Sequence, residues 1–455
     1  MGDRWQQGAV LDLEITGLNS TGEGVGRWQD RVVFVPDTVP GDRVQTRLLR
    51  IKPTYGWGKL LQVETASPER IKPACIVADK CGGCQWQTVA YTEQLAAKQQ
   101  QVADALSRIG GFESVRIDPI LPSAPLAYRN KATYPLGLSE TQQVQAGYYR
   151  KGTHKLINLN RCPVQDDRLD PFLAEIKQDI AEQGWPIYDE TTYRGALRHL
   201  SLRIGRRTRQ VLLTLVSTRP QLPQLEVMAA DWLERYPNLV GVTLNHNTKQ
   251  TNAIFGGTTY CVAGQPYVEE QFAGVQLRIG PTDFFQVNTE QAEKLLAEIL
   301  AELNLQGHER VVDAYCGIGT LTLPLAEQAK HCLGLEVSKD SVQQAQTNAA
   351  INGLSNADFQ VGAVEELLPQ VSESLGASPD VVVLDPPRKG CTAAVLQALQ
   401  ELAPARIVYM SCNPATLARD LKTLCQQGGY RLVRVQPADF FPQTAHVECV
   451  AFLIR

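Results

Sequence analysis

The C-terminal part of the chain alternates short apolar runs with longer stretches of helical periodicity. Runs at 310–313, 333–336, 381–384 and 406–409 are short and largely apolar, which predicts strands of a parallel sheet buried on both faces. An amphipathic stretch at 290–303 predicts a helix that leads into this sheet. The alternation predicts an α/β, Rossmann-like domain over residues 281–455.

The first 67 residues show a different pattern, with short alternating segments separated by glycine and proline. Strands are expected at 10–15, 32–35 and 44–48, with a turn at Pro40-Gly41-Asp42. This punctuation predicts a small OB-like β-barrel over residues 1–67. Residues 68–280 mix expected helices with strands, which predicts a central α+β domain. The helices are expected at 91–109, 171–183 and 225–235.

Composition limits the functional classes only weakly. A length of 455 residues corresponds to about three domains. Because the net charge is −4 and the pI is near 6.0, any surface that binds nucleic acid must be a local patch. No apolar stretch reaches the ~18 residues of a membrane span. Met1-Gly2-Asp3-Arg4 has no signal-like apolar character, so we expect a cytoplasmic protein, and a monomer.

Cys412 stands where a predicted strand gives way to a helix. Met410-Ser411-Cys412-Asn413-Pro414 follows the apolar run at 406–409, and a proline suits the first turn of a helix. The positive end of a helix lowers the pKa of a thiol below its usual value of about 8.5. In α/β sheets, ligands bind at the carboxyl ends of the strands, which is where Cys412 is expected to lie. We therefore expect Cys412 to be a nucleophile rather than a buried, inert cysteine.

A glycine-rich turn follows the first strand of the same domain. Cys316-Gly317-Ile318-Gly319-Thr320 comes after that strand, and Glu336 ends the next strand about twenty residues later. An acid in this position can accept hydrogen bonds from two ribose hydroxyls. A dinucleotide fingerprint would have a third glycine where this chain has Thr322. A nucleoside cofactor without phosphates, S-adenosylmethionine, therefore fits better.

Asp385-Pro386-Pro387 fixes a carboxylate at the end of the strand at 381–384. The motif suggests an N-methyltransferase acting on adenine or on a protein side chain. Such enzymes usually have an aromatic residue next, where this chain has Arg388, and they give no role to Cys412 or to Glu448 in the apolar stretch 447–453. A non-catalytic RNA-binding protein is another alternative, but it would not need the glycine turn.

Short motifs in sequential order resemble the RNA (uracil-5-)-methyltransferases. The motifs are Phe284-Phe285-Gln286-Val287-Asn288, Asp385-Pro386-Pro387-Arg388-Lys389-Gly390, Tyr409-Met410-Ser411-Cys412-Asn413-Pro414 and His446-Val447-Glu448-Cys449-Val450. The resemblance implies that Cys412 adds to carbon 6 of uracil, which activates carbon 5 toward methyl transfer, and that Glu448 removes the carbon 5 proton. Burial would raise the pKa of Glu448 toward a useful range. The resemblance also implies that the cofactor is contacted by Gln286, Tyr315, Glu336 and Asp385.

Four upstream cysteines form a second candidate site. Cys75, Cys81 and Cys84 have a C-x5-C-x2-C spacing, and Cys162 follows much later. Four thiolates with no nearby histidine suit tetrahedral zinc or an iron–sulfur cluster, and a disulfide is disfavoured in a reducing cytoplasm. The resemblance to the ribosomal-RNA branch of the family implies a [4Fe–4S] cluster. It also implies 23S rRNA as the substrate, with the T-loop of tRNA as the alternative.

Two stretches are candidates for RNA contact. Residues 22–44 resemble the TRAM domain, an OB-like RNA-binding barrel. The stretch 43–63 combines stackable rings with positive charge, as single-stranded RNA binding requires. Its rings and cations are Tyr55, Trp57, Arg43, Arg47, Arg50, Lys52 and Lys59. A second stretch predicts a hairpin whose turn carries Arg206, Arg207 and Arg209. That turn either grips phosphates or is only a charged, solvated turn.

Overall fold

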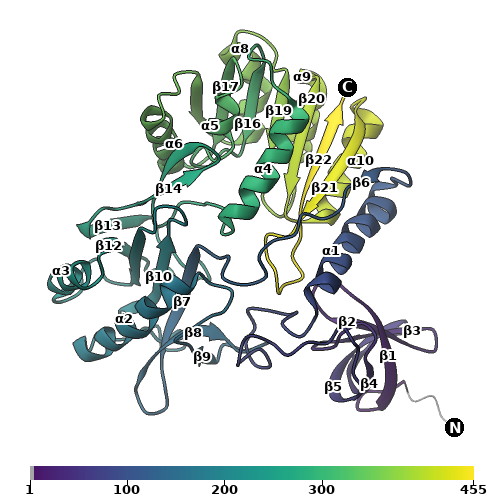
Figure 1. Cartoon of the computed structure of the whole chain (residues 1–455), viewed down its shortest axis with the longest axis vertical. Coiled ribbons are helices and arrows are strands. Elements are labelled where there is room, and N and C mark those ends of the chain that lie inside the picture. The colour runs from purple at the N-terminus through teal and green to yellow at the C-terminus, as the bar shows by residue number, and fades with distance from the viewer. Residues whose placement is uncertain (1–4) are drawn as a thin grey trace.

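A computed structural model describes residues 5–455 and divides them among a small barrel, a central sheet and a larger C-terminal sheet (Figure 1). Met1-Gly2-Asp3-Arg4, on which the expectation of a cytoplasmic protein partly rests, lies outside the described residues. Within residues 5–455, no helix is long and apolar enough to cross a membrane.

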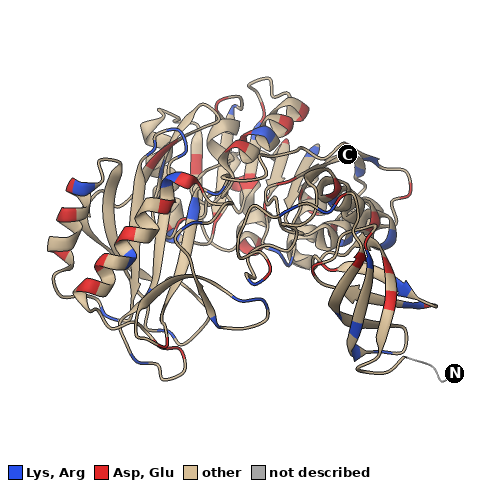
Figure 2. Ribbon diagram, turned by 60° about the horizontal axis from the view of Figure 1, so that its bottom comes forward, with Lys and Arg blue, Asp and Glu red and all other residues tan. Residues whose placement is uncertain are grey.

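The N-terminal barrel confirms the predicted β-barrel. Its five strands close in the order β1-β2-β3-β5-β4. They are β1 (Val10–Leu18), β2 (Gly24–Trp28), β3 (Arg31–Val35), β4 (Arg43–Ile51) and β5 (Tyr55–Thr65). Successive side chains of a strand face opposite ways, so Leu11, Leu13 and Ile15 fill the interior while the residues between them face solvent. Basic and acidic residues are interspersed along its strands (Figure 2).

A seven-stranded mixed sheet forms the middle of the molecule. Its strand order is β13-β12-β11-β10-β7-β8-β9. The strands are β7 (Lys131–Leu138), β8 (Val144–Tyr149), β9 (Leu156–Asn158), β10 (Leu197–Ile204), β11 (Val211–Ser217), β12 (Leu239–His246) and β13 (Thr258–Gly264). Helices α2 (Asp170–Gln183) and α3 (Leu225–Arg235) share one core with this sheet, to which they contribute Ile176 and Trp232.

The C-terminal sheet has eight strands in the order β18-β17-β16-β19-β20-β22-β21-β6. They are β6 (Arg116–Ile117), β16 (Arg310–Ala314), β17 (His331–Glu336), β18 (Ala357–Val361), β19 (Val381–Leu384), β20 (Arg406–Ser411), β21 (Arg431–Ala438) and β22 (Glu448–Ile454). The strands from β18 to β20 run parallel, and β22 is antiparallel to its neighbours. The order reverses between β16 and β19, which is where ligands bind in open α/β sheets.

Helices cover both faces of this sheet. They are α4 (Thr289–Leu303), α5 (Thr322–Ala326), α6 (Lys339–Ile351), α7 (Val364–Leu367), α8 (Val371–Leu375), α9 (Ala393–Leu402) and α10 (Pro414–Gln427). The apolar side of α4 packs into one core through Leu295 and Ile299, whereas α9 and α10 belong to the core on the other face. The predicted α/β arrangement is confirmed.

Two segments inside residues 68–280 pack with the C-terminal sheet instead of with the central one. Helix α1 (Tyr91–Ala105) contributes Val102 to the core that contains α10, and β6 pairs with the edge strand β21. The hairpin β14 (Val268–Phe272) and β15 (Val275–Ile279) shares the core of α4. Residues 68–280 therefore do not all pack around the central sheet, because the chain crosses between the central sheet and the C-terminal sheet more than once.

The arginine-rich turn between β10 and β11 differs from a free phosphate grip. Arg206 pairs with Asp166 and, at 2.9 Å, with Glu290, while Arg207 pairs with Glu290 at 3.0 Å and with Glu293. These acids lie on α4 and on the segment before α2, so the two arginines join the central sheet to the C-terminal body. The turn is therefore an ion-paired contact between domains, which neither the phosphate-binding interpretation nor the solvated-turn interpretation included.

Candidate active site

The strand register gathers the candidate residues at one edge of the C-terminal sheet. Ala314 lies beside Leu384, and Leu384 lies beside Tyr409, so the residues that follow these strands share the carboxyl edge. On the antiparallel side, Ser411 is paired with Cys449. Cys412 directly follows Ser411, and Glu448, the first residue of β22, directly precedes Cys449, so the two side chains lie near each other. Opposed residues of an antiparallel pair have Cα atoms about 4.5–5.5 Å apart.

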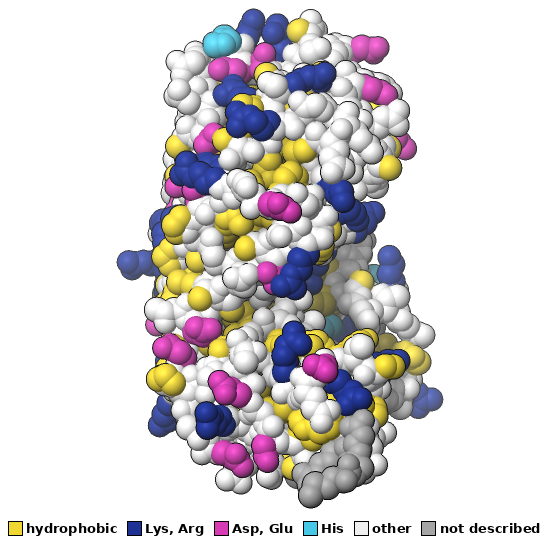
Figure 3. All heavy atoms as spheres, turned by 90° about the vertical axis from the view of Figure 1, so that its right-hand side faces the viewer, with side chains coloured by type: hydrophobic (Ala, Val, Ile, Leu, Met, Phe, Trp, Pro, Cys, Tyr) yellow, Lys and Arg dark blue, Asp and Glu magenta, His cyan; other side chains and the backbone are white. Residues whose placement is uncertain are grey.

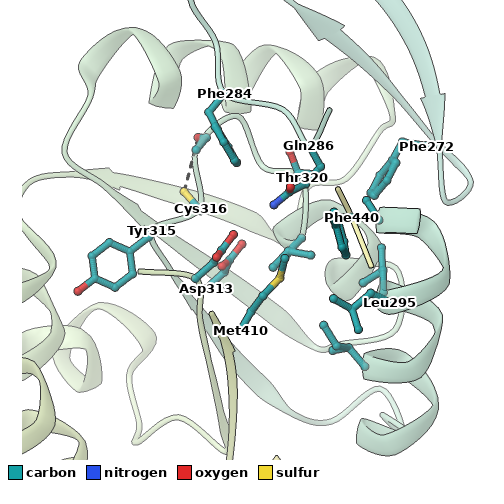
Figure 4. Close-up of a pocket in the computed structure, with 16 residues that line it drawn as sticks. Phe272, Phe284, Gln286, Leu295, Asp313, Tyr315, Cys316, Thr320, Met410 and Phe440 are labelled. Atoms are coloured by element: carbon teal, nitrogen blue, oxygen red, sulfur yellow. Dashed lines mark hydrogen bonds between the residues drawn. The ribbon is translucent and has the colours of Figure 1, made fainter. Parts of the chain in front are cut away.

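A cavity opens at the point where the strand order reverses (Figure 4). Three of the four expected cofactor residues line it, Gln286, Tyr315 and Asp385. Its other lining residues are Phe272, Phe284, Ala292, Leu295, Leu296, Ile299, Asp313, Cys316, Gly317, Thr320, Leu321, Met410 and Phe440. The carboxylate of Asp313 and the amide of Gln286 point into this mostly apolar space (Figure 4). Such a wall with a few polar groups is typical of a small-molecule site.

The glycine turn adopts the backbone shape that its sequence predicts. Gly317 and Gly319 have φ values of 56° and 88°, in the left-handed region that favours glycine. Glu336 lies under the turn, where its carboxylate accepts hydrogen bonds from the N–H groups of Gly317 at 3.2 Å and of Ser338 at 2.8 Å. Glu336 is not among the residues that line the cavity, but it remains half-buried at the adjacent strand end.

Two acids give the cavity a preference for positive charge. Asp313 is fully buried, and Thr322 donates a hydrogen bond to its Oδ2 at 2.5 Å, while its Oδ1 has no partner among the described residues. Burial raises the pKa of Asp313 and of Asp385 to about 7. A buried carboxyl oxygen without a partner suits a donor or a cation. The lining therefore fits S-adenosylmethionine, which has both a sulfonium and an amino group.

The Cys412 thiol differs from the expectation in its ionisation. Its position after β20 and before α10 is as predicted, with Asn413 as the N-cap, whose side chain accepts the Ala415 N–H at 3.1 Å. However, burial and the nearby Glu448 carboxyl raise the pKa of Cys412 to about 11, and the guanidinium of Arg388 opposes this only in part. The helix terminus therefore does not outweigh burial among acids, and the expected lowering of the pKa was wrong for the ligand-free site.

Glu448 is buried, with 5% of its surface exposed. Burial, reinforced by the charge of Asp385, raises its pKa well above the usual range for a carboxyl group, whereas Arg388 acts in the opposite direction. This agrees with the predicted direction. A carboxyl group with a raised pKa is better able to take and return protons near neutral pH.

The loop that carries Arg388 is tied to the start of α10. The Arg388 carbonyl accepts hydrogen bonds from the side chains of Asn413 at 3.4 Å and Thr416 at 3.3 Å. Arg419 of α10 donates to the Lys389 carbonyl at 2.9 Å. The loop after Asp385 and the helix after Cys412 are therefore held together. This contact keeps the Arg388 guanidinium near the Cys412 thiol.

The four upstream cysteines border a second cavity, between the segment 75–84 and Cys162. All four are free thiols in this structure. Burial, with a contribution from neighbouring cysteines, raises the pKa of Cys84 to about 11 and that of Cys162 to about 12. No group of three or more His, Cys, Asp or Glu side chains within residues 5–455 has the arrangement of a metal-ion site.

The barrel carries a partly exposed aromatic cluster close to its basic residues. Phe34, Tyr55 and Trp57 lie with ring centroids 5.2–6.2 Å apart, and the Arg50 guanidinium lies 5.1 Å from the Trp57 ring. Arg47 and Lys59 are also exposed. Basic and hydrophobic side chains adjoin at this end of the molecule in Figure 3.

Sequence reasoning missed several residues of the cofactor cavity. Asp313 could have been singled out, because it is an acid at the end of a buried strand just before the glycine turn. Met410 sits inside a motif that was attributed only to its cysteine. Phe440 had no usable signal, because it comes from the connection between β21 and β22 and reaches the cavity only through tertiary folding.

Comparison with known proteins agrees with this site. Residues 262–455 match the family described as tRNA (uracil-5-)-methyltransferase, and residues 4–61 match the TRAM domain. A Nostoc sp. protein named "Uncharacterized RNA methyltransferase" is 60% identical over 451 residues, covering 99% of this chain and 97% of its own. A Synechocystis sp. protein of the same description is 55% identical over 450 residues, covering 99% and 96%.

Among solved structures, the chain is similar to the tRNA (uracil-54, C5)-methyltransferase of Pyrococcus abyssi in complex with S-adenosyl-L-homocysteine. The TM-score is 0.77 and the sequence identity 28%, and the alignment covers 97% of this chain and 99% of the other. The predicted TRAM domain and the predicted family are both confirmed. The chain belongs to the tRNA (uracil-5-)-methyltransferase family and is an S-adenosylmethionine-dependent RNA methyltransferase.

Proposed function

We propose that this enzyme methylates carbon 5 of a uridine in RNA, with Cys412 as the nucleophile and Glu448 as the base. One observation carries the proposal: Cys412 follows the end of β20 and Glu448 begins the paired strand β22, so the two lie near each other at the sheet edge that also forms the cofactor cavity. A thiol and a carboxyl group on either side of a planar ring can add to it and deprotonate it. Neither group would be needed by an N-methyltransferase.

The proposed reaction begins with addition of the Cys412 thiolate to carbon 6 of uracil, which leaves an enolate with a nucleophilic carbon 5. S-adenosylmethionine supplies the electrophilic methyl group that carbon 5 accepts, and S-adenosylhomocysteine is the product. Glu448 then removes the proton from carbon 5. The electron pair of that C–H bond restores the carbon 5–carbon 6 double bond and expels Cys412 as a thiolate.

Positive charge must favour the ionised form of Cys412, because burial and the Glu448 carboxyl raise the pKa of this thiol to about 11. Arg388 supplies one such charge, and it lowers the pKa of both Cys412 and Glu448. A bound sulfonium beside Asp385 would add a second. In this proposal Gln286, Tyr315 and Asp385 hold the cofactor from the cavity wall, and Glu336 holds the ribose from the adjacent strand end.

We also propose that Cys75, Cys81, Cys84 and Cys162 hold a [4Fe–4S] cluster. Four free thiols border one cavity, which supports this assignment. Their ionised forms would repel one another unless a cation lay between them. A single zinc ion would need all four sulfurs within about 2.3 Å of one point. A cavity between the thiols suits a larger cluster better. Its role would be to order the central domain, since it lies outside the sheet that carries the reaction.

We propose 23S rRNA as the substrate, on the basis of the barrel and the cysteine site, and tRNA as the second candidate. A specific observation favours the second. The Pyrococcus abyssi enzyme is named for a tRNA uridine, and nearly its whole length aligns with this chain, so the overall architecture alone does not select rRNA. The aromatic and basic face of the barrel would contact either RNA by stacking and charge.

The test is to map 5-methyluridine in both RNAs from cells with and without this protein. Loss of the modification at a 23S rRNA position, restored by wild-type protein but not by Cys412→Ala, is the expected result. Loss only in tRNA would replace the proposed substrate with the second candidate. Loss of an N-methylated base with 5-methyluridine intact would refute the proposed reaction.

A further inference from the structure

The segment 439–447, which we call the strap, connects β21 to β22 and ends at Glu448. It is the yellow loop that leaves the C-terminal sheet and descends toward the middle of the molecule in Figure 1. Phe440 of the strap lines the cofactor cavity, and Thr444 lines the cavity bordered by the four cysteines. A single short segment therefore touches both cavities and leads directly into the proposed base.

The strap is fastened to the cysteine-bearing loop through its backbone. The Gln443 carbonyl accepts hydrogen bonds from the N–H groups of Gln85 and Trp86, both at 3.0 Å, and these residues directly follow Cys84. Gln443 itself has a φ of 71°, in the left-handed region that is unfavourable for a residue with a side chain. Such a conformation persists only when the surrounding contacts impose it. A change in the cysteine-bearing loop would therefore alter the backbone conformation of the strap.

A second fastening comes from α1. Gln94 and Gln443 form a reciprocal pair, in which the Gln443 N–H donates to Gln94 Oε1 at 2.8 Å and Gln94 Nε2 donates to Gln443 Oε1 at 3.2 Å. Gln94 Nε2 also donates to the Trp86 carbonyl at 3.1 Å, which links the helix, the loop and the strap at one point. Gln94 is fully buried, so these bonds are shielded from water.

The start of the strap is held by a buried ion pair. Lys98 of α1 contacts Asp439 at 2.5 Å, with both side chains fully buried, and Lys98 Nζ also donates to the Phe441 carbonyl at 3.0 Å. The Tyr128 hydroxyl, from the wall of the cysteine cavity, donates to the Pro442 carbonyl at 3.0 Å. The contacts of Lys98 join the strap to α1, and the hydrogen bond of Tyr128 joins it to the wall of the cysteine cavity.

We propose that the strap couples the four-cysteine cavity to Glu448, with Gln94 as a positioning residue for the base. The inference rests on the proposed function, because it concerns the step assigned to Glu448. Cys412 is carried by β20 and α10, which the strap fastenings do not include. A loosened strap, which contributes Phe440 to the cofactor cavity, would therefore slow the removal of the carbon 5 proton more than it slows thiolate addition and methyl transfer. Methylated RNA would then accumulate in covalent attachment to the enzyme.

The test compares the full-length wild-type protein with Gln94→Ala, Cys84→Ala and a matched control, Asn245→Ala. Asn245 is also a fully buried amide with several hydrogen bonds, but it lies in the central sheet away from the strap. Hydrogen–deuterium exchange of the peptide covering 439–447 reports the strap, and peptides from β10 and β11 report whether each variant is folded. The fraction of enzyme covalently bound to methylated RNA, and the affinity for S-adenosylhomocysteine, are measured in parallel.

Gln94→Ala should raise exchange in the strap by about ten-fold, the effect of losing one buried hydrogen-bonded contact, and Cys84→Ala should raise it in the same direction through the neighbouring Gln85 and Trp86. Both should raise the covalent fraction by a larger factor than they change the S-adenosylhomocysteine affinity, to which the strap contributes Phe440, and Asn245→Ala should do neither. Unchanged exchange in Cys84→Ala would overturn the coupling. An unchanged covalent fraction in a folded Gln94→Ala would overturn the positioning role. If Gln94→Ala does not fold, Gln443→Ala is the second variant, since it removes the side-chain half of the pair, from Gln94 Nε2 to Gln443 Oε1, and keeps the backbone bond to Gln94 Oε1.

Glu448→Gln separates this inference from the proposed function. That variant should accumulate the covalent species with normal exchange in the strap. If Glu448→Gln instead turns over normally, the assignment of the base fails, whereas the exchange data from Cys84→Ala still decide whether the cysteine cavity and the strap are coupled.

Discussion

Charge on the bound cofactor should control the ionisation of Cys412. In the ligand-free site, burial and Glu448 raise the pKa of this thiol to about 11. At pH 8 only about one Cys412 in a thousand would then be a thiolate. A ligand that brings a positive charge to the cavity beside Asp385 should lower this pKa, whereas a neutral ligand of the same shape should not.

The size of the effect follows from Coulomb's law. At an effective dielectric constant of about 20, a unit charge about 8 Å from the sulfur contributes about 2 kcal/mol, or about 1.5 pKa units. The thiolate fraction, and with it the rate of reaction with an alkylating reagent, should rise by about thirty-fold at any pH below the pKa.

Alkylation by iodoacetamide measures this directly. The modified Cys412 peptide is quantified by mass spectrometry across pH, with S-adenosylhomocysteine as the neutral ligand and sinefungin, which replaces the sulfonium by a protonated amine, as the cationic one. Comparing two ligands of nearly equal shape removes the effect of steric shielding, and Cys412→Ser identifies the peptide. Equal rates with the two ligands would refute the electrostatic reasoning. A midpoint near pH 8 without ligand would show that the helix terminus outweighs burial after all.

Three further predictions concern the base, the ribose contact and the cysteine site. Glu448→Gln keeps the shape of the side chain but cannot take a proton, so turnover should fall by about 100-fold or more while a methylated covalent species accumulates in denaturing gels; normal product release would assign the base elsewhere. Glu336→Ala should weaken S-adenosylmethionine binding by about 1.5–3 kcal/mol, the contribution of a hydrogen bond to a charged group, and calorimetry showing unchanged affinity would exclude the ribose role. Protein purified without oxygen should be brown and contain about four irons per chain, and Cys162→Ser should lose both the colour and thermal stability; colourless protein with one zinc would favour the tetrahedral alternative.

Much of the fold could be predicted because its signals are local. Short apolar runs such as 381–384 are buried on both faces and became central strands, and the Asn413-Pro414 pair begins a helix where helix-capping chemistry places it. The site residues of the C-terminal domain followed from the same logic, because the residues after parallel strands meet at one edge. The neighbouring positions of Cys412 and Glu448 follow from the pairing of β20 with β22.

What could not be predicted depends on contacts between distant parts of the chain. The sequence of helix α1 does not say which sheet the helix packs against, and only the tertiary structure shows that Val102 joins the C-terminal core. The charge of Arg206 is evident in the sequence, but its acidic partner Glu290 is 84 residues away. The pKa of Cys412 is raised and not lowered for the same reason. The helix that follows Cys412 is visible in the sequence, whereas the burial of the thiol and the nearby Glu448 carboxyl come from other parts of the chain.

The covalent role of Cys412 is tested most directly with RNA that contains 5-fluorouridine at the target position. Fluorine cannot be removed from carbon 5 as a proton is, so the reaction should stop after methyl transfer with the enzyme still attached. The account predicts a complex that survives denaturation, whose mass equals enzyme plus RNA plus one methyl group and whose linkage maps to the Cys412 peptide. Active enzyme that forms no such complex, or a Cys412→Ala variant that still methylates uridine, would contradict it.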